Sequence, residues 1–208
     1  MTVEQSAVAW PVFRIAPGAH SFPFDYSDED VTNLGALLVP EHADPDGTLQ
    51  AWARAFVLST PTDTLSLLKD LNASILGPVA YRTRDEEGTQ TALETLAKAS
   101  GSCRDIAALF IEAVRHLGFG ARAVSGYLFD PDATAGDAGS THAWAEVYLP
   151  GAGWIAFDPT HRQLGGASLI PVAVARNNRQ IMPIVGGYVG AAEDFNAMNV
   201  EVSVTQEL

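Results

Sequence analysis

The apolar residues of this chain change their spacing once, and the change separates a helical first half from a strand-rich second half. Up to Gly118 they recur three and four residues apart, which is typical of helices that bury one face. From Ala121 onward, stretches that alternate apolar and polar residues and are rich in β-branched and aromatic types predict strands. Helices first and antiparallel strands afterwards are typical of an α+β fold.

Four helices and six strands are expected from this pattern. The helices cover about residues 48–58, 61–76, 91–99 and 103–117, the second with Pro61 at its first helical position. The strands cover about residues 121–129, 141–149, 154–159, 169–175, 181–190 and 198–205. Residues 1–45 contain five prolines, which disfavour helices and central strands. We therefore expect an irregular N-terminal arm in residues 1–45 and the main folded unit in residues 46–208.

Composition excludes several classes of function. The chain has 208 residues, of which 47% are hydrophobic and 18% charged, as in a folded domain with a substantial core. The formal charge of −13 argues against nucleic acid or an anionic membrane as a partner, because both bind basic patches. No secretory signal and no apolar run of bilayer length is visible, so we expect a cytoplasmic protein.

The chain has a single cysteine, Cys103, which therefore cannot form a disulfide within the chain. Ser102 and Asp105 have the spacing of a capping box, which makes Cys103 the first residue of a helix. Unpaired backbone N–H groups and the positive end of the helix dipole favour the thiolate there. Without further partners, a small buried apolar residue explains a lone cysteine better than a nucleophile does.

His142 and Asp158 supply those partners if one strand register is adopted. His142 begins one predicted strand, Asp158 ends the next, and residues 150–153 have the composition of a hairpin turn. Pairing Leu149 with Gly153 would make the two side chains diagonal neighbours on one face, with Cα atoms roughly 7–8 Å apart. A slip of one residue would place them on opposite faces. With this register, the order Cys, His, Asp is that of a nucleophile, its base and the residue that orients the base.

Four segments resemble the transglutaminase-like superfamily, in particular its bacterial cysteine-protease-like branch. They are Gly101–Asp105, Gly118–Tyr127, His142–Val147 and Trp154–Thr160. The resemblance runs from about residue 48 to the C-terminus. It implies a papain-like fold in which N-terminal helices pack on an antiparallel sheet, and it makes residues 46–208 a transglutaminase-like catalytic domain. It also implies that Cys103, His142 and Asp158 form a catalytic triad.

The chain departs from this family at two places. Bacterial members usually carry a β-rich domain before the core, so one interpretation of residues 1–45 is a remnant of that domain. The family often has Gly-Arg-Asp-Tyr downstream of the aspartate motif, where this chain has residues 175–178, Ala-Arg-Asn-Asn. The role of Arg176 and Asn177 is left open.

Other candidates are interpreted more simply. His161 is expected to be a loop residue close to Asp158, and Asp105 a helix cap rather than a proton carrier. Cys103, His142 and His161 lack the paired short spacings of zinc sites, and the loop of residues 130–137 lacks the final glutamate of a calcium loop. We therefore expect no metal and no cofactor.

These features predict a cysteine hydrolase or acyltransferase. It would cleave peptide or other amide bonds through an acyl-thioester on Cys103, with a peptide, protein or small amide as its substrate. Two alternatives stay open. One is a protein-crosslinking transglutaminase that uses the same triad, and the other is a non-catalytic protein-interaction module with this fold. The sequence also leaves the oligomeric state open.

Overall fold

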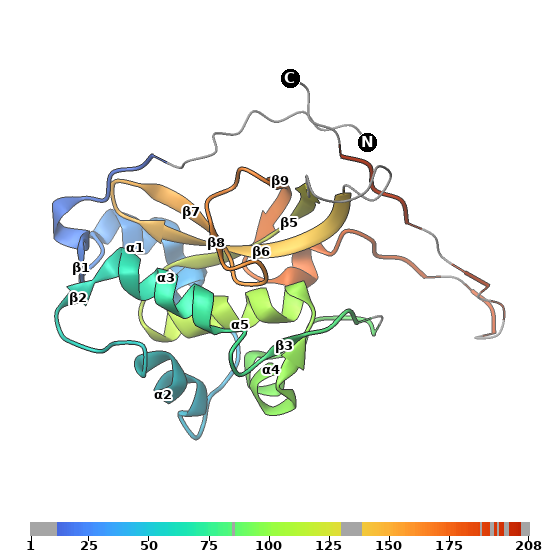
Figure 1. Cartoon of the computed structure of the whole chain (residues 1–208), viewed down its shortest axis with the longest axis horizontal. Helices are drawn as coiled ribbons and strands as arrows, with labels where there is room; N and C mark the ends of the chain where they lie inside the picture. Colours follow the sequence, from blue (N-terminus) through green and yellow to red (C-terminus); the bar gives the residue numbers. More distant parts are fainter. Residues whose placement is uncertain are drawn as a thin grey trace.

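A five-stranded antiparallel sheet lies over a group of helices in the computed structural model (Figure 1). The structure describes residues 12–84, 86–129, 139–187, 189–191, 194, 196–197 and 200–204. The strands are β5 (Ala121–Phe129), β6 (Gly139–Leu149), β7 (Gly153–Asp158), β8 (Gln163–Leu164) and β9 (Leu169–Ala175). Their order in the sheet is β8-β7-β6-β5-β9. Strands β5, β6 and β7 therefore each pair with the strand that follows them in the chain.

Helix α5 (Cys103–His116) is buried along most of its length beneath this sheet. Its apolar side chains and alternate residues of β6, among them Ala145 and Val147, belong to one core cluster. Phe110 of the helix stacks on Phe157 of β7, with ring centroids 5.4 Å apart. The opposite face of the sheet carries a smaller cluster around Trp144. Because side chains alternate along a strand, β6 thus contributes to both faces.

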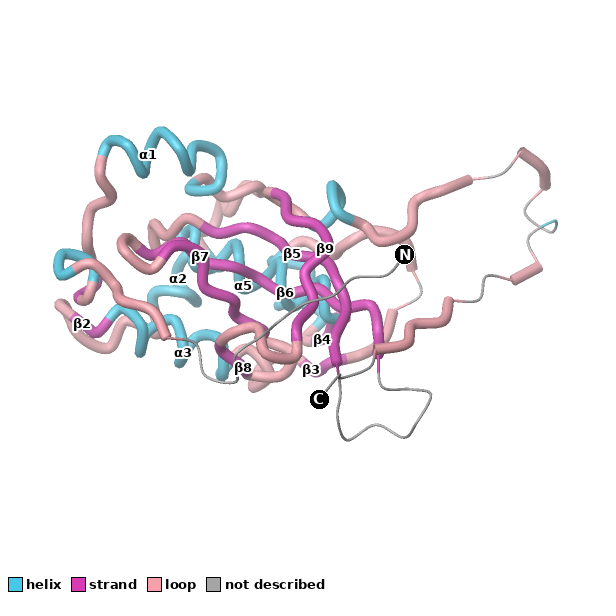
Figure 2. The backbone as a smooth tube through the Cα atoms, turned by 90° about the horizontal axis from the view of Figure 1, so that it is seen from above, coloured by secondary structure: helices cyan, strands magenta, loops and turns pink. Residues whose placement is uncertain are grey.

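Three further helices complete the layer below the sheet, and Figure 2 shows α2, α3 and α5 behind the strands. They are α2 (Thr48–Arg54), α3 (Thr64–Ser74) and α4 (Ala92–Lys98). The prediction that the second helix starts at Pro61 is wrong. Asp63 is its N-cap, since the Asp63 carboxylate accepts a hydrogen bond of 2.7 Å from the Ser66 N–H. Residues Thr62–Asp63 instead form the short strand β2, which pairs with β1 (Ser21–Phe22).

The N-terminal arm is more regular than expected. It contains α1 (Asp28–Leu34) and two 3-10 turns, η1 (Pro17–Ala19) and η2 (Gly35–Leu38). Ser27 caps α1 by accepting from the Asp30 N–H, a signal that the prolines around this stretch obscured. The arm packs against the main unit, because the Tyr26 hydroxyl donates to the Tyr148 carbonyl oxygen and accepts from the Gly120 N–H. The division between residues 45 and 46 stays a prediction.

Two of the expected strands are not formed in the part of the chain that the structure describes. Residues 178–181 form the 3-10 turn η3 (Asn178–Ile181), and residues 182–187, 189–190 and 200–204 have no strand. Val185 is largely exposed there. The alternating apolar residues of this stretch therefore do not pack on a neighbouring strand as the prediction required. Residues 198, 199, 205 and the acidic loop 130–137 lie outside the described residues. A short parallel pair, β3 (Ala80–Tyr81) and β4 (Ser100–Gly101), leads into α5.

Across the described ranges, no helix combines the length and apolar character that a membrane span requires.

Candidate functional site

Cys103 is the first residue of α5, as predicted, and a buried carboxylate fixes the turn that presents it. The Oδ2 atom of Asp105 accepts from the Ser102 N–H and from the Ser102 hydroxyl, both at 2.8 Å. The same oxygen accepts from Arg84 Nε, and Oδ1 accepts from the Gln90 N–H. Because both of its oxygens accept hydrogen bonds, Asp105 stabilises the helix start, in agreement with its interpretation as a cap.

His142 and Asp158 meet through the predicted hairpin register. Leu149 pairs with Gly153, so the connecting loop has an odd number of residues. The two side chains then share a face, and His142 Nε2 lies 2.8 Å from Asp158 Oδ2. The Asp158 side chain is 0% exposed, and the His142 side chain 4% exposed. The predicted register of the hairpin and the contact between these two side chains are thus confirmed.

The charges of these groups favour a thiolate and an imidazolium. Burial opposes ionisation of the Cys103 thiol, but a hydrogen bond with His142, the imidazolium charge and the N–H groups of Ala143 and Arg104 together lower its pKa. Burial also disfavours charge on His142, yet its hydrogen bonds to Asp158 and Cys103 raise the pKa of His142 to about 9. Hydrogen bonds from two imidazoles outweigh the burial of Asp158 and hold its pKa well below the usual range.

Cys103 and His142 line a small pocket of about 80 Å³. Part of its lining comes from β5 and β6, and another part from η3 and the two residues after it, Met182 and Pro183. Asn178 of η3 is anchored to the helix start, since its Nδ2 donates to the Arg104 carbonyl oxygen at 2.8 Å. On the sheet side, the Trp144 ring is stacked near the imidazole with centroids 6.0 Å apart. The buried indole both belongs to the smaller core cluster and excludes water from one side of His142.

His161 is part of this site in a way that the sequence reasoning missed. Its Nδ1 lies 2.8 Å from Asp158 Oδ2, the oxygen that also contacts His142. Asp158 Oδ1 accepts from the backbone N–H groups of Thr160 and His161. The His142 and His161 rings meet edge to face, with centroids 5.1 Å apart. The sequence signal was the separation of three residues from Asp158, which a tight turn converts into contact.

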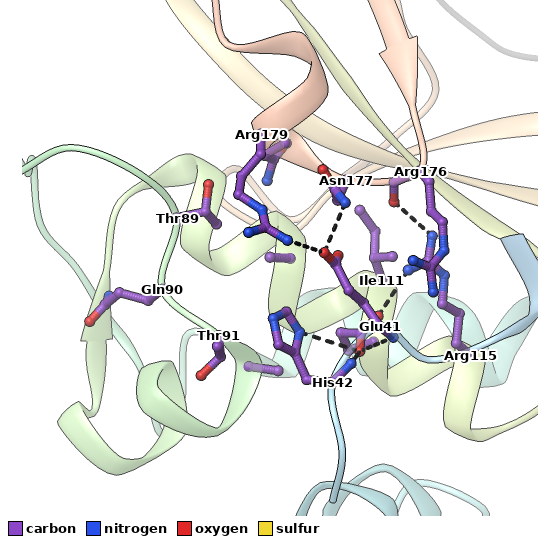
Figure 3. Close-up of a pocket in the computed structure, with 14 residues that line it drawn as sticks. Glu41, His42, Thr89, Gln90, Thr91, Ile111, Arg115, Arg176, Asn177 and Arg179 are labelled. Carbon is purple, nitrogen blue, oxygen red and sulfur yellow. Dashed lines mark hydrogen bonds and ion pairs between the residues drawn. The ribbon is translucent and has the colours of Figure 1, made fainter. Parts of the chain in front are cut away.

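A larger pocket of about 160 Å³ (Figure 3) shares one lining residue, Asn178, with the Cys103 pocket. Its wall contains the buried pair Glu112 and Arg115, whose charged atoms are 2.9 Å apart. Glu112 accepts from the N–H groups of residues 41 and 42, and Arg115 donates to the Leu37, Ala121 and Arg176 carbonyls. It is the larger of the two pockets, but the thiol of Cys103 lines the other one.

Arg176 and Asn177, whose role the sequence left open, line this second pocket. Arg176 donates to the carbonyl oxygens of Ala36, Val39 and Pro40. Asn177 and Arg179 both donate to Glu41 Oε1. Figure 3 shows the Asn177 and Arg179 side chains both pointing toward Glu41. The segment thus binds the N-terminal arm to the end of β9, so a structural role accounts for it.

This chain is similar to known proteins in sequence and in fold. A sequence profile of the transglutaminase-like superfamily matches residues 50–159. An uncharacterized protein of Mycobacterium tuberculosis is 30% identical over 207 residues, which cover 94% of this chain and 61% of that protein. An uncharacterized protein of Mycobacterium leprae is 34% identical over 115 residues, which cover 53% of this chain and 40% of the relative. The chain thus spans 61% of the length of the relative from Mycobacterium tuberculosis.

One solved structure with a similar fold is a putative cysteine protease from Cytophaga hutchinsonii. It matches with a TM-score of 0.61 and 25% identity, over 79% of this chain and 53% of that chain. This likeness and the arrangement of helices beneath an antiparallel sheet confirm the predicted papain-like α+β fold.

Proposed function

This chain belongs to the transglutaminase-like superfamily, and we propose that it is a cysteine hydrolase that cleaves peptide or other amide bonds. The proposed catalytic residues are Cys103, His142 and Asp158. One observation carries the proposal: the only thiol of the chain starts a helix and shares a pocket with an imidazole that a buried carboxylate holds at 2.8 Å. The likeness to the putative cysteine protease from Cytophaga hutchinsonii supports the reaction class.

The geometry supports a two-step reaction. The Cys103 thiolate attacks the amide carbon, and backbone N–H groups at the start of α5 stabilise the oxyanion. His142 Nε2 is held by Asp158, so the other ring nitrogen, Nδ1, carries the proton that passes to the leaving amine. The C–N bond breaks and an acyl-thioester remains on Cys103. Water, deprotonated by His142, then attacks the thioester and releases the acid and the thiol.

The same residues would serve amine transfer if a primary amine replaced water in the second step. We favour hydrolysis because the Cys103 pocket is small, at about 80 Å³, and is bordered by the exposed segment after η3, which keeps the thioester within reach of water. The net charge of −13 supports a peptide or amide substrate over nucleic acid or an anionic membrane. We propose the cytoplasm as the compartment.

Alkylation with iodoacetamide tests the activated thiol directly, since Cys103 is the only cysteine and all label reports on it. We expect rapid labelling near pH 6 and its loss in the His142→Ala variant. Labelling that begins only above about pH 8.5 would identify an ordinary thiol and contradict the proposal.

Measurements of turnover distinguish hydrolysis, amine transfer and a non-catalytic interaction module. The purified chain is screened against a peptide and amide library with and without primary amines. Release of acid in both conditions supports hydrolysis, and an amine-dependent product supports transfer. Fast labelling without turnover of any substrate would favour the interaction module.

A further inference from the structure

Asp158, His142 and His161 together form a ligand set of a kind that metal ions use. Their donor atoms, one carboxylate oxygen and one nitrogen from each imidazole, all lie within 4.8 Å of one another. We propose that these three residues bind a divalent transition-metal ion such as Zn²⁺, and that the bound ion switches off the thiol chemistry. The inhibitory half of this inference rests on the proposed function, and the binding half does not.

The ligand chemistry selects the class of ion. Two imidazole nitrogens and one carboxylate oxygen suit Zn²⁺ and its neighbours, whereas Ca²⁺ and Mg²⁺ prefer oxygen alone. Three protein ligands leave a fourth tetrahedral position for water. The set differs from the combination of Cys103 with two histidines that the sequence argued against, because a carboxylate replaces the thiol.

Two of the three distances between ligand atoms require only small movements. Metal bonds of about 2.0–2.2 Å place tetrahedral ligand atoms roughly 3.3–3.5 Å apart. Asp158 Oδ2 lies 2.8 Å from each of the two ring nitrogens, so each pair must separate by about half an ångström. The His161 side chain is 39% exposed, which leaves it free to adjust and gives the ion a route to the two buried ligands.

The surroundings already orient the carboxylate. Asp158 Oδ1 accepts from the N–H groups of Thr160 and His161, at 3.0 and 3.3 Å. Those bonds direct Oδ2 toward the two imidazoles. Groups behind the ligands commonly hold metal sites in this way. The formal charge of −13 also attracts cations to the molecule.

Metal binding would stop the proposed reaction through His142. The ion forms bonds to His142 Nε2 and to His161 Nδ1. The proton on His142 Nε2 leaves to solvent, and the proton that His161 Nδ1 shares with Asp158 is exchanged through solvent to His161 Nε2. The hydrogen bond from His142 to Asp158 is replaced by two bonds to the ion. The remaining proton of His142 then stays on its Nδ1, beside Cys103, and the ring can no longer accept another proton to become an imidazolium. No thiolate–imidazolium pair forms while the metal is bound.

Calorimetric titration of the metal-free chain with Zn²⁺ tests the site without any substrate. We expect one ion per chain, and undiminished binding in Cys103→Ala, because the thiol is not a ligand. His161→Gln should bind more than about 10-fold more weakly. The matched control is His42→Ala, whose imidazole is similarly exposed, at 43%, and lies outside this cluster. Circular dichroism checks that each variant is folded.

Three results would overturn the metal site. They are absence of binding to the wild type, loss of binding in Cys103→Ala, and unchanged binding in His161→Gln. The spectrum of the Co²⁺ complex provides a test without a variant, since an intense thiolate charge-transfer band would identify Cys103 as a ligand. The proposed inhibition is tested by labelling and turnover with Zn²⁺, which should slow both, and less so in His161→Gln. Binding without inhibition refutes only the proposed inhibition. A protein that binds Zn²⁺ but has no activity refutes only the proposed function.

Discussion

Replacing Asp158 by asparagine should remove most of the reactivity of Cys103 near neutral pH. The pKa of His142, about 9, is about 2.5 units above its ordinary value of 6.5. At 1.36 kcal/mol per unit, this shift corresponds to about 3 kcal/mol in favour of the imidazolium. Burial alone would move the pKa the other way, so the hydrogen bonds and charges of Asp158 and Cys103 produce the shift.

The size of the effect follows from that shift. If the uncharged amide returns the pKa of His142 to its ordinary value, the ion pair loses a factor of about 300 relative to the neutral pair. Part of the shift comes from Cys103, so we expect iodoacetamide labelling at about pH 6 to slow by on the order of 100-fold. The amide keeps the size of the side chain, which limits the change to charge and hydrogen bonding.

The assay compares labelling rates from pH 5 to about pH 9 by mass spectrometry of the intact chain. Asp70→Asn is the control, because Asp70 is an exposed acid on α3. A rate for Asp158→Asn within about threefold of the wild type at pH 6, in a folded protein, would refute the ion-pair reasoning.

Three further predictions concern stability, each measured as the free energy of unfolding in urea. Gly126→Ala should cost about 1–3 kcal/mol, because the new Cβ would overlap the Ile170 carbonyl oxygen, whereas Gly166→Ala, with open space around it, should cost under about 1 kcal/mol. Glu112→Ala should cost about 3–5 kcal/mol by leaving the buried charge of Arg115 unpaired; a loss under 1 kcal/mol would contradict that role. The raised pKa of His142 stabilises the fold fully below pH 6.5, and this contribution is lost as the pH rises through about 9. The free energy of unfolding of His142→Ala should lack that pH dependence. If it changes with pH as steeply as that of the wild type, the pH dependence belongs to another group.

Local patterns predicted the elements that contain the site. The capping residues around Cys103, the apolar stripe of α5 and the alternation in β5, β6 and β7 are short-range features, and each can be recognised from the residues of its own element. The same alternation misled in residues 181–190. A strand needs a neighbour for its backbone groups, and among the described residues no strand lies beyond β9 in the sheet.

The sequence by itself determined that a thiol would start a helix and that a histidine and an aspartate could share one face of a hairpin. These are consequences of capping and of the two-residue repeat of a strand, which local residues encode. Only the tertiary structure decided that α5 would deliver Cys103 to the end of β6 where His142 lies. It also decided that His161 would contact Asp158 and that Arg176 would bind the N-terminal arm. Those contacts depend on turn geometry and on the packing of segments up to 140 residues apart, which no local pattern contains.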